Sequence, residues 1–103
     1  MQVIQRDTLK SVAQNIVIIL TTPKGSDPHR PLFGSELWQF LDKPLTAITK
    51  GKIKAEIVEA IHTWEPRVIL EEVSLKKEQA GLKVLIKYRI EETESVQTEE
   101  IIL

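Results

Sequence analysis

The most regular pattern of apolar and polar positions lies between residues 82 and 91, where every second position from 82 to 90 is apolar. A period of two is typical of a β-strand with one buried face, so the pattern predicts a strand. Residues 68–76 predict a second strand, and the phase of its apolar positions shifts between Leu70 and Val73. A β-bulge, or cover on both faces of the strand, accounts for such a shift.

A short turn is predicted between these strands at residues 79–81, because Gly81 can adopt the positive φ that a tight hairpin requires. The last segment, residues 96–103, is polar at its start and apolar at its end. It predicts either a third strand or a tail that docks on another surface.

Apolar residues in the first half of the chain recur at helical spacing. Leu9, Val12 and Ile16 predict a first helix that ends near residue 20. A loop rich in proline and glycine follows over residues 21–31. Ser35 is then predicted to cap a short second helix.

The longest helix is predicted to begin near Thr46 or Thr49 and to end at about Trp64. Its apolar residues follow one face, and Pro66 pushes the residue before it out of helical geometry. The predicted class is therefore α+β, with three N-terminal helices packed on a C-terminal antiparallel sheet of two to three strands. We expect one domain over residues 1–103, helical over about 7–65 and sheet over about 67–103.

Composition narrows the classes of function. The formal net charge is -1 and there is no cysteine, so neither the basic excess of nucleic-acid binding nor thiol chemistry is expected. The longest aliphatic run, residues 16–20, is far shorter than the roughly 20 residues of a membrane-spanning helix. The first residues lack the order of a signal peptide, and we expect a cytosolic product.

Catalytic chemistry finds little support in the sequence. The carboxylates nearest the aromatic residues of the first half are Asp27, Glu36 and Glu65, and none lies in a local lysozyme motif. His29 and His62 lack the spacing of metal ligands. We find no glycine-rich phosphate loop and no recognisable nucleophile triad. The sequence therefore predicts no enzyme activity, no cofactor and no metal site.

Glu65 stands at the predicted C-terminal end of the longest helix. A carboxylate there faces the negative end of the helix dipole, which costs about 0.3–1 kcal/mol unless a cation compensates it. One alternative is an internal ion pair with Arg67 or Arg30 that fixes the helix to the first strand. The other is that Glu65 and Arg67 project outward and dock on another protein, with Pro66 fixing their relative direction.

Three short segments, in order along the chain, resemble motifs of one protein family. Residues 14–25 resemble the end of its first helix and its T-P-x-G loop, and residues 30–37 resemble its R-P-x-F-G-S-x-L segment. Residues 64–67 match its most characteristic motif, W-E-P-R. The chain thus resembles the contractile-tail baseplate wedge and sheath-initiator family. That family includes W-type phage tail proteins, a type VI secretion baseplate component and members labelled tail lysozymes.

One loop departs from the family pattern. The family usually places an acidic and a basic residue directly after the loop glycine, whereas Gly25 is followed by four other residues, including Asp27, before Arg30. Contacts of this loop are therefore expected to follow the family less closely than contacts at Glu65 and Arg67.

The resemblance implies a structural baseplate component of a contractile phage tail or tail-like injection system. It implies docking on wedge subunits, strand addition by the sheath protein to template the first sheath ring, and further contacts with tube or hub proteins. It also implies six copies in the assembled baseplate and no nucleic-acid or membrane partner. Assembly would occur in the bacterial or archaeal host cytoplasm, before incorporation into the tail or injection particle.

Two other functions stay open at this stage. A peptidoglycan-degrading tail lysozyme follows from the label that some family members carry. A stress-response anti-adaptor is the role of one divergent relative, although the intact W-E-P-R motif argues against it.

Partner contacts are predicted at the W-E-P-R junction, in the loop and along the sheet edges. An open edge can accept a strand from another chain, so strands over 68–76 and 96–103 are predicted to meet the sheath. Alternatively, their polar residues only protect the edges from aggregation. Arg67→Ala is predicted to leave the domain largely folded and to stop sheath assembly. The predicted partner-binding residues are Glu65, Pro66, Arg67, Arg30, Trp38, Val68, Leu70 and Ile101.

Overall fold

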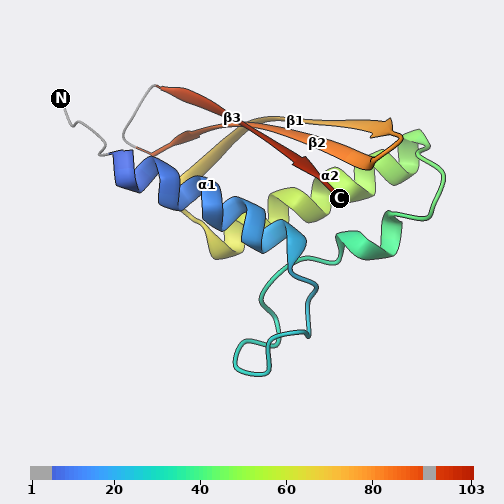
Figure 1. Ribbon diagram of the computed structural model, residues 1–103, viewed down its shortest axis with the longest axis horizontal. Helices are drawn as coiled ribbons and strands as arrows, with labels where there is room; N and C mark the ends of the chain where they lie inside the picture. Colours follow the sequence, from blue (N-terminus) through green and yellow to red (C-terminus); the bar gives the residue numbers. More distant parts are fainter. Residues whose placement is uncertain (1–5, 92–94) are drawn as a thin grey trace.

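The computed structural model describes residues 6–91 and 95–103. The helices lie on one face of a twisted sheet, and the loop after the first helix extends away from that sheet (Figure 1). In chain order, the elements are α1 (Arg6–Thr21), the 3-10 helix η1 (Leu37–Phe40), α2 (Ala47–Trp64), β1 (Val68–Glu78), β2 (Gly81–Ile90) and β3 (Val96–Ile102).

The α+β class, the N-terminal helices and the antiparallel sheet are as predicted, but the prediction of three α-helices is wrong. The described part of the chain has two α-helices, and the third predicted helix is the single turn η1. Ser35 does not cap it, because its buried hydroxyl donates to the carbonyl oxygen of Leu20 at 3.0 Å. The N–H of Glu36, at the start of η1, instead donates to the carboxylate of Glu56 at 2.9 Å. Tertiary contacts thus replace the cap.

The sheet has the order β1-β2-β3, with both neighbouring pairs antiparallel. The register of β1 shifts between Leu70 and Glu72, which confirms the bulge predicted from the apolar pattern. Gly81 has a φ of +138° at the start of β2, as the turn prediction requires. The segment at the C-terminal end is a third strand, so β2 is central and β1 and β3 form the two edges.

The core lies between the helices and the sheet. The alternating apolar residues of β2 face the helices and are buried, as predicted, and β1 and β3 contribute fewer buried side chains. Burying an isoleucine or valine side chain contributes about 1.5–3 kcal/mol. The fully buried aliphatic residues of this core are Val12, Ile16, Ile53, Ile57, Ile61, Val84 and Ile86.

Helix α2 begins and ends as the sequence predicts. Thr46 is its N-cap, and the hydroxyl of Thr46 accepts the N–H of Thr49 at 3.2 Å. At the other end, the N–H of Glu65 donates to the carbonyl oxygen of Ile61 at 2.7 Å. No helix within the described residues is both long enough and apolar enough to cross a membrane.

Gly51 weakens α2 without a packing reason. No atom lies within 4 Å of the position that a Cβ would take, and Gly51 lies inside the helix. We expect Gly51→Ala to raise the free energy of unfolding by about 0.5–1 kcal/mol, because alanine favours the helix and restricts the unfolded chain. Urea denaturation measures this change, and a loss of stability would contradict the open surroundings of Gly51.

Candidate functional site

The junction between α2 and β1 brings three elements together around one carboxylate. Glu65 is only 3% exposed. Its carboxylate accepts two hydrogen bonds from Arg67, at 2.6 Å from Nη2 and 3.1 Å from Nε. Asn15 of α1 donates a third at 3.2 Å. The carboxylate therefore ties α1 and the end of α2 to the start of β1.

The pair is charged at neutral pH. Burial alone would raise the pKa of Glu65, but hydrogen bonds from Arg67 and Asn15, together with the charge of Arg67, outweigh burial and lower that pKa. The hydrogen bond to Glu65 in turn raises the pKa of Arg67. Such bidentate pairs between a guanidinium and a carboxylate are among the strongest in proteins.

This geometry has the features of the internal ion pair that the sequence left as one alternative. The partner is Arg67 and not Arg30, and Glu65 does not project outward in this chain. The side chain of Arg67 is 47% exposed, so part of the guanidinium is accessible at the surface. Pro66 separates the two residues at the turn. Docking of another protein at this junction stays a prediction.

The loop between α1 and η1 is held to the end of α2 by its side chains. Asp27 accepts the N–H of His29 at 2.9 Å and pairs with Nε of Arg30 at 3.2 Å. The guanidinium of Arg30 lies 3.9 Å from the ring centre of Phe33. Phe33 meets Trp64 edge to face, with 5.1 Å between ring centres. Asp27 and Arg30 thus form an acidic and basic pair in space, although they are not adjacent in sequence.

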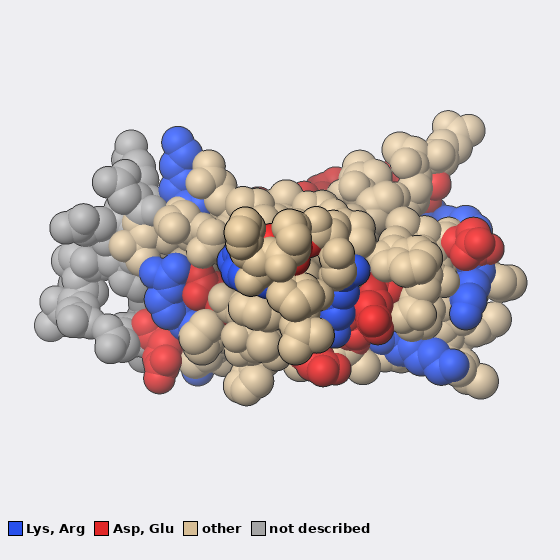
Figure 2. All heavy atoms as spheres, turned by 90° about the horizontal axis from the view of Figure 1, so that it is seen from below, with Lys and Arg blue, Asp and Glu red and all other residues tan. Residues whose placement is uncertain are grey.

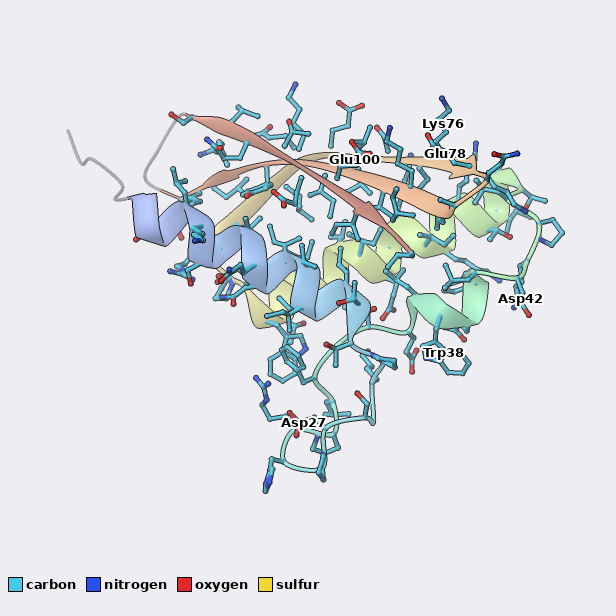
Figure 3. All side chains as sticks on the ribbon, in the orientation of Figure 1. Asp27, Trp38, Asp42, Lys76, Glu78 and Glu100 are labelled. Carbon is cyan, nitrogen blue, oxygen red and sulfur yellow. The ribbon has the colours of Figure 1, made fainter. Side chains whose placement is uncertain are left out.

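Trp38 is the one aromatic residue among the predicted contact residues, and its side chain is exposed. It is 60% exposed on η1 and points away from the sheet (Figure 3). By contrast, Val68 and Ile101 are 7% and 4% exposed, and Leu70 is half-buried. These three side chains pack toward the core, so they offer little surface to a partner at β1 or β3.

Charges of both signs are mixed on the face that carries the helices and the loop. In Figure 2, Lys and Arg residues alternate with Asp and Glu residues around a middle region of uncharged residues. Groups of three or more His, Asp or Glu side chains able to hold a metal ion are absent from the part of the chain that the structure describes.

Comparison with known proteins identifies the family. Residues 6–95 match the family model described as baseplate wedge protein gp25. The chain belongs to the gp25 family. This confirms the resemblance to contractile-tail baseplate proteins that the sequence motifs indicated.

Relatives of this gp25-family chain occur in two phages. It is 37% identical over 73 residues to baseplate protein W of Escherichia phage P2, which is 71% of this chain and 64% of that protein. It is 35% identical over 60 residues to baseplate wedge protein gp25 of Enterobacteria phage T4, which is 58% of this chain and 46% of that protein. The chain thus spans less than two thirds of either relative.

Two solved structures share the fold. A candidate tail lysozyme from Geobacter sulfurreducens superposes with a TM-score of 0.81 at 27% identity, covering 99% of this chain and 96% of that one. A chain of the postcontracted R2 pyocin baseplate superposes with a TM-score of 0.72 at 30% identity, covering 88% of this chain and 99% of that one.

Sequence reasoning missed one residue of the junction. The helical pattern places Asn15 on the polar face of α1, yet Asn15 is half-buried and bonded to Glu65, fifty positions away. One signal was available. Asn15 lies in the segment 14–25 that resembles a family motif, and an asparagine that only faced solvent would not need to match that motif. Its position at the border of the apolar face lets it reach the carboxylate.

Proposed function

We propose that this gp25-family protein is a structural component of a contractile tail or tail-like baseplate that docks on wedge subunits and templates the first sheath ring. The observation that carries the proposal is a three-stranded sheet whose edge strands β1 and β3 have no further strand beside them among the described residues, and these are the strands predicted to meet the sheath. An unpaired edge offers a row of backbone donors and acceptors to a strand from another protein. Six copies per baseplate, assembly in the host cytoplasm and a single domain over residues 1–103 belong to the same proposal.

Wedge docking would use the surface that carries the α2–β1 junction, η1 and the loop before η1, and not the edges of the sheet. Arg67 offers the exposed part of its guanidinium, and Trp38 offers an aromatic anchor of the kind enriched at protein interfaces. The loop with Arg30 extends away from the sheet (Figure 1). Tube or hub proteins are further candidate partners of this loop.

Removal of the chain tests the proposal directly. In a host that carries the full gene cluster of the tail or injection particle, deletion of this chain should yield tubes without sheath, and the intact chain supplied in trans should restore sheathed particles. Electron microscopy of purified particles counts both forms. Sheathed, contractile particles in normal number without the chain would overturn the proposed role.

A tail-lysozyme function has one relative in its favour and poor chemistry in the chain. Glycoside hydrolysis needs a carboxylic acid with a raised pKa. The pKa of Asp27 is lowered, chiefly by the N–H of His29, and the pKa of Glu65 is lowered within its ion pair. We expect purified protein to release no peptidoglycan fragments above a buffer control. Sustained turnover at a rate proportional to protein concentration would contradict a purely structural role.

A further inference from the structure

The backbone groups of β3 alternate between its paired side and its free side. Leu82 and Leu103 exchange both backbone hydrogen bonds, at 3.1 and 2.9 Å, and so form a hydrogen-bonded pair. In an antiparallel ladder such pairs alternate with pairs whose N–H and C=O groups point outward. By the register with β2, these outward residues are Thr98, Glu100 and Ile102. Their backbone groups have no backbone partner outside the sheet among the described residues.

The two edges differ in how they are protected. β1 has a bulge between Leu70 and Glu72, and it carries the exposed residues Lys76 and Lys77. Bulges and edge lysines are the usual means by which proteins block unwanted strand pairing. β3 (Val96–Ile102) pairs with β2 without a register shift and contains neither lysine nor proline. β3 is therefore the better acceptor of an added strand.

An apolar hollow adjoins the end of β3. Its volume is about 230 Å³, and it lies between β3, the end of α1 and η1. Trp38, Leu41 and Ile102 are 60%, 41% and 48% exposed at this place. A strand on the free side of β3 would pass this hollow and could place an apolar side chain in it. The apolar residues that line the hollow are Leu20, Leu37, Trp38, Leu41, Ile102 and Leu103.

Two carboxylates stand in the middle of the same edge. Glu100 lies on the outer face of the sheet (Figure 3). Its carboxylate is 3.4 Å from Nζ of Lys83, which also lies 3.7 Å from the carboxylate of Glu78. Glu99 forms no ion pair with a cation in the described residues. Like charges directly opposite destabilise a strand pair and opposite charges stabilise it. The edge thus favours a basic strand and disfavours pairing with β3 of a second copy.

We infer that β3, and not β1, accepts an extended segment of another protein with a defined side-chain pattern. That segment carries adjacent basic residues opposite Glu99 and Glu100, and apolar residues at alternate positions opposite Ile101 and Leu103. One of these apolar side chains fills the hollow beside Trp38. This inference rests on the proposed strand addition and names both the edge and the chemistry of the added strand.

Short peptides test the inference on the purified chain. The probe is Thr-Lys-Lys-Val-Thr-Val with blocked ends, in this order and in the reverse order, and the control has Glu in place of both Lys. In nuclear magnetic resonance titrations of ¹⁵N-labelled protein, one basic peptide should shift the amides of β3 and the indole of Trp38. It should bind about tenfold more tightly than its acidic control. Shifts confined to β1, or no binding of either basic peptide, would overturn the inference.

Matched variants separate the two edges. Thr98→Pro removes an outward N–H of β3 but no hydrogen bond to β2, and Lys77→Pro does the same on β1. Thr98→Pro should abolish peptide binding, and Lys77→Pro should leave it unchanged. Glu99→Lys with Glu100→Lys keeps the backbone and should reverse the preference toward the acidic peptide. An unreversed preference would contradict the assignment, and so would self-association of the free natural protein in sedimentation.

The same variants in assembling particles distinguish this inference from the proposed function. If the deletion abolishes sheaths and only Lys77→Pro reproduces it, strand addition stands and the choice of β3 is wrong. If the deletion itself leaves sheaths intact, the proposed function fails. The expected result is loss of sheaths with Thr98→Pro and normal sheaths with Lys77→Pro.

Discussion

Arg67→Ala is expected to lower the free energy of unfolding by about 2–3 kcal/mol, because it leaves a buried charge with one remaining partner. Glu65 is 3% exposed, and Arg67 supplies two of its three side-chain hydrogen bonds. Asn15 alone cannot replace the charge of the guanidinium. Urea denaturation at pH 7 measures the loss. The variant should stay mostly folded at 25 °C, so its effect on assembly can be tested separately.

A second substitution shows whether the buried charge is the cause. Glu65→Gln in the Arg67→Ala background removes the charge and keeps the shape, so the double variant should recover at least about 1 kcal/mol of the loss. The single variant Glu65→Gln should be less destabilised than Arg67→Ala. If Arg67→Ala is as stable as the natural chain, or if Glu65→Gln fails to rescue it, the ion pair does not hold the junction.

The same pair predicts how stability depends on pH. The pKa of Glu65 is lower in the folded chain than its ordinary value of about 4.3, so its ion pair stabilises the fold above that pH. This contribution is lost as the pH falls below about 4.3 toward the folded value. The difference in free energy of unfolding between the natural chain and Glu65→Gln should therefore shrink between pH 7 and pH 3. A difference that stays constant would contradict the lowered pKa.

Gly34→Ala is expected to destabilise the chain by about 3 kcal/mol or more. Gly34 has a φ of +109°, and an added Cβ would overlap the carbonyl oxygen of Thr22. That oxygen accepts the N–H of Ser35 at 2.9 Å, and Ser35 accepts the N–H of Lys24 through its own carbonyl at 3.0 Å. Alanine would add backbone strain to a clash with backbone that cannot move away without breaking these bonds. The loop with Arg30 would lose its fixed base.

Gly25→Ala is the matched control for this expectation. Gly25 has a φ of +88°, but no atom lies within 4 Å of the position of its Cβ. It should cost only the positive φ, about 1–2 kcal/mol. Urea denaturation of both variants gives the comparison. Equal losses would mean that the close approach of Gly34 to Thr22 contributes nothing.

The sequence predicted correctly those elements that depend on residues close together in the chain. The period of two in β2, the phase shift in β1 and the cap at Thr46 each follow from a few neighbouring residues, and all three are present. The short second helix was wrong because the hydroxyl of Ser35 bonds Leu20 across the fold. Nothing near Ser35 in sequence indicates that contact.

The site was predictable in its location and not in its geometry. The dipole argument required a cation near Glu65, but it could not choose between Arg67 and Arg30 or foresee Asn15 from another helix. Likewise, the apolar end of the last segment made Ile101 a predicted contact residue, but it did not indicate that the side chain of Ile101 is buried and that its backbone pairs with β2. The apolar hollow beside Trp38 joins residues of three separate segments, so no local pattern contains it.

A cryo-electron microscopy reconstruction of the assembled baseplate that contains this chain tests the central claim most directly. The account predicts wedge subunits against Arg67 or the loop, and a strand of a sheath subunit hydrogen-bonded to the free edge of the sheet at Thr98, Glu100 and Ile102. A particle in which both sheet edges face only water and the junction touches no other protein would contradict the account.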